Sequence, residues 1–480
     1  GSKKNAQIFY QYVLNDKQIS TKHMQHIATN LLELGDLKTA TNIFEKLMSE
    51  KFESEGLFIN LSNLYLNAER FGDSINLLKR AKEKYPLNEI ISFNLGNLYK
   101  KEGNFLEAIR EFKLAINIKN NFHQAYSNLG VTYNNIGEYS KGLKLLVRSL
   151  SINKKTNVSR YSSLTNIGIA FITLGKFKEG WEKYEYRWKV DPGDKVVWPL
   201  KDKPLWDGKS KSEVLLWREQ GIGDDIIFLG LVPEAYEAAG RAMSVLIDPR
   251  LIPICERSMP GIEFLPATKG SVLEDRFDYQ LPMGSLPRLF RNSEEDFNRT
   301  RQRYFKADMT RVEQLRKELR VKGRKVIGIS WKSFKSLNTT KKSMDLDEFG
   351  RIFKGCNVTL LNLQYGEVDE EIREFTKNTG IEVLQSSSVD LREDLDGLAA
   401  LIELCDLVVS TSNVTIHMAG ALGKDSWVLL PFAANFWWLV ERTDSLWYPT
   451  VRLYRQKSLQ DWSEILEVIR SDLDQRFDKL

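Results

Sequence analysis

The sequence predicts an α-helical repeat solenoid followed by an α/β region with parallel sheets. Two observations support this fold class. The first is a 34-residue period of small and large residues through the first 190 residues. The second is a change, from about residue 196, to short β-rich runs that alternate with helical stretches. At 480 residues the chain is long enough for two or three domains.

In the sequence, the repeats are recognised by a series of small residues at nearly constant spacing. Each is followed after seven positions by a turn residue and after twelve by a second small residue. The first small residues are Ala28, Ser62, Gly96, Gly130 and Gly168, the turn residues are Gly35, Glu69, Gly103, Gly137 and Gly175, and the second small residues are Ala40, Ser74, Ala108, Gly142 and Gly180. This pattern resembles the tetratricopeptide repeat, a helix pair that buries its apolar face by stacking on neighbours. Such an array implies a curved surface for a polypeptide partner.

Composition is typical of a globular protein. Hydrophobic residues make up 42% of the chain and charged residues 28%, and the formal net charge is +5. No stretch of 18 apolar residues could span a membrane, and the first residues lack the apolar core of a signal peptide. We therefore expect a cytoplasmic protein. No basic run is interleaved with aromatic residues, which disfavours nucleic acid as a partner.

Changes in pattern divide the chain into an N-terminal arm or helix (1–20), five repeats (21–194), a first α/β half (195–320) and a second α/β half (321–480). Two such halves imply a cleft between two Rossmann-like domains, whose ligands sit at the carboxyl ends of the strands. The predicted strands are Val214–Trp217, Met243–Ile247, Ile262–Leu265, Lys325–Trp331, Val358–Leu363, Ile381–Leu384, Leu407–Ser410 and Trp427–Leu430.

Three aromatic residues end the fifth repeat. Trp181, Tyr184 and Trp188 fall at helical spacing just before a Pro-Gly pair that stops the helix. We expect these side chains to dock the repeats onto the α/β region.

The first stretch with chemical potential is an apolar strand followed by a glycine-rich turn and two acids. Gly221 and Gly223 let the backbone approach a ligand closely, and Asp224 and Asp225 stand where a helix begins. One of these carboxylates could face the cleft and take a proton from an acceptor hydroxyl. The alternative is a tight turn with an aspartate cap.

The second stretch is a strand that ends in Ser330, Lys332 and Ser333. A lysine above a cleft offers a compact charge to a leaving diphosphate. Its alternative role is to keep the surface soluble.

The third stretch runs strand, polar turn, helix, strand. Residues 410–415 place hydroxyls and backbone amides at a helix start, which is a pattern typical of an anion site. His417 follows inside the helix and is the one histidine after the repeats. It is therefore the one side chain in the α/β region whose intrinsic pKa is near neutral. The alternative is a core histidine with its hydrogen bonds satisfied.

Two DxD patterns, Asp345-Asp347 and Asp394-Asp396, could indicate a metal-bound sugar diphosphate. Both stand where a helix is predicted to begin, so we expect them to cap helices. The chain has no HExxH, CxxC, GxSxG or Walker motif. We therefore expect no metal and no P-loop chemistry.

Together these stretches resemble tetratricopeptide repeats fused to a GT-B glycosyltransferase module related to the ADP-heptose transferases and, more distantly, to O-GlcNAc transferase. The segments that carry the resemblance include EGWEKYEYRW, LLWREQGIGDD, IGISWKS, LLNLQYGE, STSNVTIHMAGALGK and WYPTVRLYRQ. The resemblance implies a GT-B fold of two Rossmann-like domains and a nucleotide sugar as donor substrate, with no further cofactor.

The resemblance also implies roles for single residues. Asp224 would be the catalytic base, with Gly223 in the turn beside the ligand. The donor's phosphates would lie at Ser412, Asn413 and Thr415, beside His417, with Ser330, Lys332 and Gln364 at the neighbouring strand ends. Heptosyltransferase-like members usually carry Asp-Thr where this chain has Ser412-Asn413, so the resemblance leaves both sugar and nucleotide open.

An asparagine stands two residues before the first small residue of four repeats. The four are Asn60, Asn94, Asn128 and Asn166, and His26 takes this place in the first repeat. Amide side chains in such a ladder can bond both the C=O and the N–H of an extended peptide. O-GlcNAc transferase is similar in this respect. The alternative is that asparagine is simply common at this repeat position.

The sequence therefore predicts a metal-independent glycosyltransferase that moves a sugar from a nucleotide sugar to Ser or Thr hydroxyls of a protein held by the repeats. On family grounds this acceptor would be flagellin or another bacterial surface protein. One alternative is a transferase for a lipid-linked or polysaccharide acceptor. Another is a non-catalytic repeat scaffold with a degenerate transferase module. The sequence leaves open the stereochemical outcome and the oligomeric state.

Overall fold

The computed structural model describes residues 19–155, 157–190, 198–200, 202–268, 276–321, 323–333 and 343–477. The predicted N-terminal arm lies almost wholly outside these ranges. By its internal contacts the chain forms two compact units, Gly1–Lys154 and Lys155–Leu480. Each unit is described by itself.

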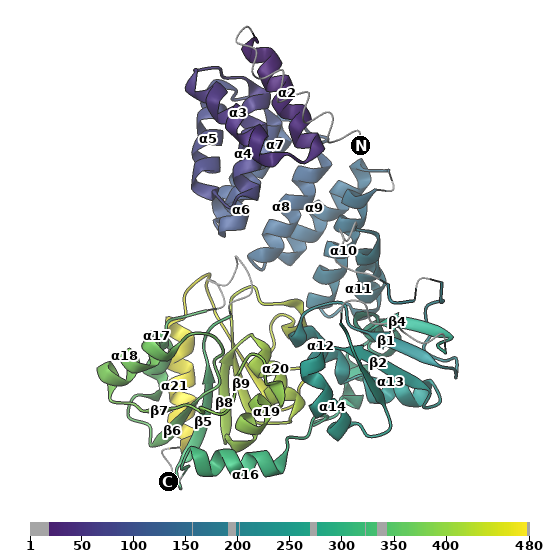
Figure 1. Cartoon of the computed structure of the whole chain (residues 1–480), viewed down its shortest axis with the longest axis vertical. Helices are drawn as coiled ribbons and strands as arrows, with labels where there is room; N and C mark the ends of the chain where they lie inside the picture. The colour runs from purple at the N-terminus through teal and green to yellow at the C-terminus, as the bar shows by residue number, and fades with distance from the viewer. Residues whose placement is uncertain are drawn as a thin grey trace. The chain divides into compact units, whose positions relative to one another are not determined.

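The first unit is a series of helix pairs, drawn from purple to blue in Figure 1. Short polar side chains cap several of the helices; for example, Ser54 accepts a hydrogen bond from the Leu57 amide, and Asn88 accepts from the Ile90 and Ile91 amides. The helices are α2 (Thr21–Leu34), α3 (Leu37–Ser49), α4 (Glu55–Asn67), α5 (Phe71–Lys84), α6 (Glu89–Glu102), α7 (Phe105–Ile118), α8 (His123–Asn135) and α9 (Tyr139–Ile152). The predicted helical repeats are confirmed.

The small residues of the period lie where the two helices of a pair touch. A Cβ added at Gly130 on α8 would come within 2.9 Å of the Gly142 carbonyl oxygen on α9. In the pair α4 and α5, the Ser74 hydroxyl donates to the Ser62 carbonyl at 2.8 Å. Side chains larger than these would push the helices apart. The turn residue between the helices has a positive φ in all five repeats, including the non-glycine Glu69 at 59°.

The second unit begins with the fifth helix pair, α10 (Val158–Thr173) and α11 (Phe177–Tyr184), and the 3-10 turn η1 (Glu185–Lys189). Trp181 and Tyr184 belong to the same buried core as the first sheet and the helices around it. Trp188 packs on Trp217 at the end of the first strand, with ring centroids 5.4 Å apart. The expectation that these aromatics dock the repeats onto the α/β region is confirmed for this pair.

The first sheet has four parallel strands in the order β3-β2-β1-β4 (teal in Figure 1). Its strands are β1 (Val214–Trp217), β2 (Met243–Ile247), β3 (Glu263–Pro266) and β4 (Tyr279–Pro282). Between and after them come α12 (Ile222–Leu229), α13 (Val232–Ala238), η3 (Pro249–Leu251), α14 (Ile252–Ser258), η4 (Met283–Ser285), α15 (Leu286–Phe290), η5 (Glu295–Arg299) and α16 (Met309–Glu318).

The second sheet has six parallel strands in the order β10-β9-β8-β5-β6-β7. Its strands are β5 (Lys325–Ser330), β6 (Val358–Asn362), β7 (Val383–Leu384), β8 (Leu407–Thr411), β9 (Ser426–Leu430) and β10 (Val451–Arg455). Its helices are α17 (Leu346–Gly350), η7 (Arg351–Phe353), α18 (Asp369–Thr379), α19 (Leu395–Leu404), α20 (Val414–Ala421), η8 (Phe436–Trp438) and α21 (Ser463–Phe477).

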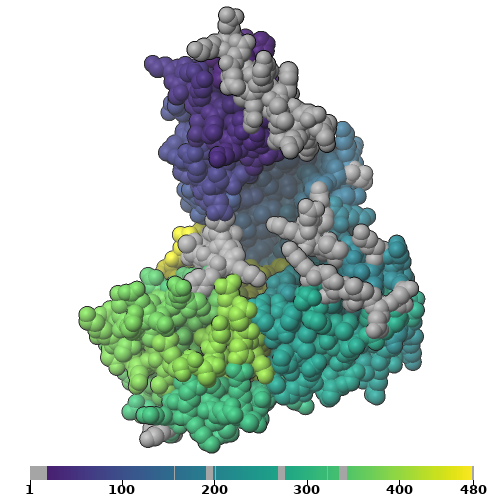
Figure 2. All heavy atoms as spheres, in the orientation of Figure 1, coloured from purple at the N-terminus to yellow at the C-terminus, as the bar shows by residue number. Residues whose placement is uncertain are grey.

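Both faces of the second sheet are covered. Ile327 and Ile329 of β5 face a core with α17, α18 and α21, whereas Val326 faces the core shared with the first sheet. Strands buried on both faces read as continuous apolar runs, as predicted for parallel sheets. Figure 2 shows the teal and green surfaces of this unit meeting directly.

All eight predicted strands form, with ends that differ by at most two residues. The strands β4 and β10 were not predicted. Within the described residues, no helix combines the length and apolar character needed to cross a bilayer.

The helix contacts of the repeats lead to a stability prediction. Gly130→Ala should destabilise the protein by about 1–3 kcal/mol, because the new methyl group meets backbone at Gly142 and the Leu146 side chain. Gly72→Ala is the matched control, since a Cβ there meets nothing within 4 Å. It should be neutral or stabilising by up to about 1 kcal/mol. Urea unfolding followed by circular dichroism measures both, and equal effects would contradict this packing account.

Candidate functional site

Each sheet has a switch point, at which the chain stops adding strands on one side of its first strand and continues on the other side. In the first sheet β1 lies between β2 and β4, and in the second β5 lies between β6 and β8. Ligands of open parallel sheets bind at such switch points. The turn with Gly221 and Gly223 follows β1 directly, and Ser330 at the end of β5 pairs in register with Ser410 of β8. The three predicted stretches therefore all lie at these edges.

Helix packing brings the turn after β1 to the turn after β8. Helix α12, which starts in the first turn, packs against α20, which starts in the second. A Cβ added at Gly223 would lie 3.1 Å from Cδ2 of His417. Glycine at this position therefore lets the histidine ring approach the backbone of α12. Residues from the two sheets thus form one candidate site.

The two neighbouring acids of α12 have different surroundings. Asp224 is half-buried, and its Oδ1 accepts a hydrogen bond of 3.0 Å from the indole N–H of Trp437. Its Oδ2 accepts from the Gly221 amide at 3.3 Å, so the carboxylate also bonds back to the start of its own helix. Asp225 is 1% exposed, and its Oδ2 lies 2.9 Å from Nε of Arg218. Of the two acids, Asp224 is the one with access to a ligand.

Burial governs the chemistry of the second acid. The cost of removing a carboxylate from water raises the pKa of Asp225 from 3.8 to about 8, against the opposing attraction of Arg218. Arg218 also pairs with Asp248 at 2.7 Å, which divides its charge between two acids. Asp225 is thus a structural group behind the turn.

Asn413 organises the turn after β8. Its Oδ1 caps α20 by accepting from the Thr415 amide at 3.0 Å, and its Nδ2 donates to the Ser330 hydroxyl at 2.7 Å. Gln364, after β6, completes the network: its Oε1 accepts from the Ser330 hydroxyl at 3.0 Å and from the Lys332 amide at 2.7 Å. The predicted donor residues do come together, but most of them are buried and bond to each other. The half-buried Ser412 is the member of this turn that lies nearer to solvent.

Lys332 has an acidic partner in this structure. Its Nζ forms an ion pair of 2.5 Å with Glu371 of α18, and these two side chains are 28% and 24% exposed. Glu371 also accepts hydrogen bonds from the Trp331 indole and the Leu346 amide. The lysine therefore reaches an incoming phosphate only by leaving or sharing this carboxylate.

His417 is buried in aromatic surroundings. Its Nδ1 lies 3.1 Å from the Tyr448 hydroxyl, and its ring stacks on Trp438 with centroids 5.4 Å apart and planes at 14°. The side chain is 7% exposed. This is the environment of a packed histidine at the floor of the site, with its ring next to Gly223.

Two adjacent tryptophans of η8 were not predicted as site residues. Trp437 donates to Asp224, and Trp438 donates from its indole nitrogen to the Ser412 hydroxyl at 2.9 Å. One short turn thus bonds to the acid of the first sheet and to the turn of the second. A signal existed in the sequence, because Phe436-Trp437-Trp438 is an aromatic run shortly after the strand β9.

Buried polar atoms without a hydrogen-bond partner lie at the carboxyl edge of the second sheet. Among the described residues these include Oγ1 of Thr411, at the end of β8, and Nε2 of Gln456, just after β10. Oδ1 of Asn435, next to η8, is a third. An unpaired buried polar group costs about 1–3 kcal/mol, and bonds from a ligand would recover part of it.

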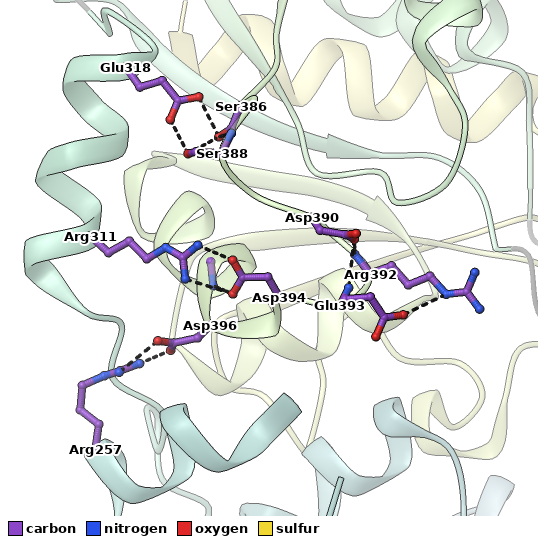
Figure 3. Close-up of polar contacts among 11 residues, drawn as sticks. Arg257, Arg311, Glu318, Ser386, Ser388, Asp390, Arg392, Glu393, Asp394 and Asp396 are labelled. Carbon is purple, nitrogen blue, oxygen red and sulfur yellow. Dashed lines mark hydrogen bonds and ion pairs between the residues drawn. The ribbon is translucent and has the colours of Figure 1, made fainter. Parts of the chain in front are cut away.

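The DxD pattern at Asp394-Asp396 is engaged by arginines. Asp394 caps α19 through the Gly397 amide at 2.8 Å and pairs with Arg311 of α16, and Asp396 pairs with Arg257 of α14 (Figure 3). The expected capping role is confirmed for Asp394. Asp345 stands at the start of α17 without a side-chain capping bond. Among the described residues no three His, Cys, Asp or Glu side chains gather as a metal site would require.

The asparagine ladder makes bonds between neighbouring repeats. In the first unit, Asn60 Nδ2 donates to the Thr29 hydroxyl at 3.4 Å, and Asn128 Nδ2 donates to Asn97 Oδ1 at 2.6 Å. Each acceptor directly follows the small residue of the preceding repeat, so the two bonds are equivalent. Asn94 is half-buried at the same repeat position, and Asn166 is half-buried in the second unit.

Comparisons with known proteins identify the repeats. The family model described as tetratricopeptide repeat matches residues 91–122. The chain is similar to Protein FlbA of Caulobacter vibrioides, with 27% identity over 424 residues that cover 84% of this chain and 70% of that protein. It is also similar to the peroxisomal targeting signal receptor of Kluyveromyces lactis, with 27% identity over 28% of this chain and 24% of the receptor. The N-terminal region therefore contains tetratricopeptide repeats, which are protein-binding modules.

Solved structures similar to the chain match about a third of its length. A crystal structure of the MamA protein is 20% identical, covers 36% of this chain and 90% of its own, and has a TM-score of 0.29. A thermophilic tetratricopeptide-repeat protein of Thermus thermophilus is 16% identical, covers 36% of this chain and 93% of its own, and has a TM-score of 0.31.

The buried acid leads to a pH prediction. Because the pKa of Asp225 rises to about 8 in the folded protein, the folded state holds this proton more tightly than the unfolded state. Its contribution to stability is complete below about pH 4 and is lost as pH rises towards 8, at roughly 1.4 kcal/mol per pH unit. Asp225→Asn cannot ionise and should lack this loss. Unfolding at pH 5 and pH 8 measures the difference; a gap between wild type and variant that does not change with pH would contradict it.

Proposed function

We propose that the protein is a metal-independent GT-B glycosyltransferase. It transfers a sugar from a nucleotide sugar to Ser or Thr hydroxyls of a protein acceptor bound by the tetratricopeptide repeats. The acceptor expected on family grounds is flagellin or another bacterial surface protein. The two parallel sheets are the two Rossmann-like domains in this proposal.

One observation carries the proposal: a half-buried carboxylate from the first sheet lies beside the polar turn of the second. A Cβ at Gly223 would lie 3.1 Å from the His417 ring, so the two turns approach closely. Trp437 donates its indole N–H to Asp224, and the adjacent Trp438 donates to Ser412. An acceptor hydroxyl near Asp224 and a donor phosphate near Ser412 would then meet at one place. The unpaired polar atoms of Thr411 and Gln456 at the same sheet edge favour a polar ligand there.

The reaction follows from this arrangement. The acceptor oxygen forms a bond to the anomeric carbon of the sugar, and the bond from that carbon to the phosphate oxygen breaks. Asp224 takes the hydroxyl proton, and the nucleotide leaves with the bonding electrons. Amides and hydroxyls at the start of α20 stabilise the leaving phosphate, and Lys332 adds its charge when it turns from Glu371.

Asp224→Asn tests the base directly. Asparagine keeps the size and can still accept the Trp437 hydrogen bond, but it cannot take a proton. Transfer should fall by roughly 10²–10⁴-fold, while donor affinity stays near the wild-type value. Intact-mass measurement of the acceptor gives the transfer rate, and calorimetry with the nucleoside diphosphate gives the affinity.

Asp225→Asn is the matched control, because it makes the same change one residue further at a buried site. It should retain transfer at neutral pH. A variant at 225 that loses transfer, together with a 224 variant that keeps it, would show that the base is misassigned.

The asparagine ladder is tested in the first unit. Changing Asn94 and Asn128 together to Ala should weaken acceptor binding by roughly 1 kcal/mol per lost amide pair and leave donor hydrolysis without acceptor unchanged. Thermal melts control for the lost Asn128–Asn97 bond, and Asn121→Ala, at an exposed turn position, is the control variant. Unchanged acceptor binding in the double variant would contradict the hypothesis that the asparagine ladder binds an extended peptide, and it would favour a lipid-linked or polysaccharide acceptor.

A further inference from the structure

The indole ring of Trp437 is enclosed by other aromatic rings. Trp181 of α11 stacks on it with centroids 6.2 Å apart and planes at 28°. Phe228 of α12 meets it edge-on at 5.3 Å and 82°, and Trp447 meets it at 5.5 Å and 90°. The ring is 2% exposed. Contacts on several sides fix the orientation of the ring, so its N–H already points at Asp224 and no rotamer change is needed.

The residue that stacks on Trp437 comes from the fifth repeat. Trp181 is 1% exposed and is itself held by a hydrogen bond of 2.7 Å from its indole nitrogen to the Arg291 carbonyl. Trp181 of the fifth repeat therefore stacks on Trp437, which in turn donates a hydrogen bond to the acid of the candidate site.

A second set of bonds runs from the same repeat to the segment between β1 and the glycine turn. Arg187 of η1 binds Glu219 through two parallel hydrogen bonds of 3.0 and 2.8 Å. The side chains are only 12% and 4% exposed, so water screens this pair weakly. Gln220, the next residue, donates to the Tyr184 hydroxyl at 2.8 Å. Asp224 follows four residues later in the chain.

We propose that Trp437 is a positioning residue for the Asp224 carboxylate and that Trp181 holds Trp437 in place. The fifth repeat is then a working part of the active site, whereas the first unit has the separate task of binding the acceptor. This inference rests on the proposed function, because it takes Asp224 as the base. The Trp437 indole holds Oδ1 of this carboxylate, and the Gly221 amide donates to Oδ2 at 3.3 Å, so the whole group keeps a fixed orientation. An acceptor hydroxyl that approaches the carboxylate then meets it in one geometry, which raises the share of reactive encounters.

Trp437→Phe tests this role, because phenylalanine keeps a ring in the cluster and removes the N–H. The turnover number kcat should fall about ten- to hundredfold while KM for both substrates stays within about twofold. Trp181→Leu, which removes the stacking ring, should lower kcat in the same way. Trp447→Phe is the matched control, since Trp447 packs edge-on against the same ring, while the hydrogen bond to Asp224 comes from the Trp437 indole. It should leave kcat within about twofold of wild type.

Two outcomes would overturn the inference. One is a wild-type kcat in Trp437→Phe, and the other is an equal loss in Trp447→Phe, which would mean that general packing is responsible. If Trp437→Phe does not fold, benzothienylalanine at position 437 replaces it, because this residue has the shape of tryptophan and lacks the N–H. A wild-type kcat in that variant, or an equal loss of kcat in Trp447→Phe, would again overturn the inference.

A readout without catalysis separates this inference from the proposed function. Unfolding of Trp437→Phe, Asp224→Ala and the double variant forms a double-mutant cycle. The bond predicts a non-additive cycle, and additive effects would overturn it. If the wild-type protein transfers no sugar, the proposed function fails, and if Asp224→Asn retains transfer, the assignment of the base fails. If Asp224→Asn is inactive and Trp437→Phe behaves as wild type, the positioning role alone fails.

Discussion

The close approach of Gly223 to His417 is the contact on which the candidate site depends. It lets α12 and α20 pack together, and these helices begin at the carboxyl edges of two different sheets. A Cβ at 223 would lie 3.1 Å from Cδ2 of the histidine ring. The half-buried acid, the polar turn and the two tryptophans then come within bonding distance of one another.

The fifth repeat links the sequence period to the α/β region. By its period it belongs with the other four repeats, but by its contacts it belongs to the compact unit Lys155–Leu480. A terminal repeat has an apolar face with no following repeat to cover it. Here Phe177, Trp181 and Tyr184 bury that face in the core of the α/β region. The end of the solenoid is thereby capped by the domain that carries the proposed chemistry.

The sequence predicted the parts of the fold that local pattern determines. The repeat period placed the helix pairs, and the apolar runs placed eight strands. The strand β4 escaped because Gln280 interrupts its apolar run and its pairing with β1 defines it. The strand β10 escaped because Arg452 and Arg455 interrupt its apolar pattern. In the site, the sequence placed the acids and the polar turns, but it could not show that Asp225 is buried against Arg218 or that Lys332 pairs with Glu371, 39 residues away. Such pairs are settled by tertiary packing.

Release of nucleotide from nucleotide sugars in the presence of EDTA tests the central claim most directly. The purified chain would be incubated with a panel of nucleotide sugars that differ in base and sugar, and the free nucleotide would be measured over time. The account predicts slow release from at least one of these donors, unaffected by chelator, because protein groups alone stabilise the leaving phosphate. Release that stops in EDTA and returns with manganese would contradict the metal-independent mechanism, and no release or binding of any donor would support a non-catalytic scaffold.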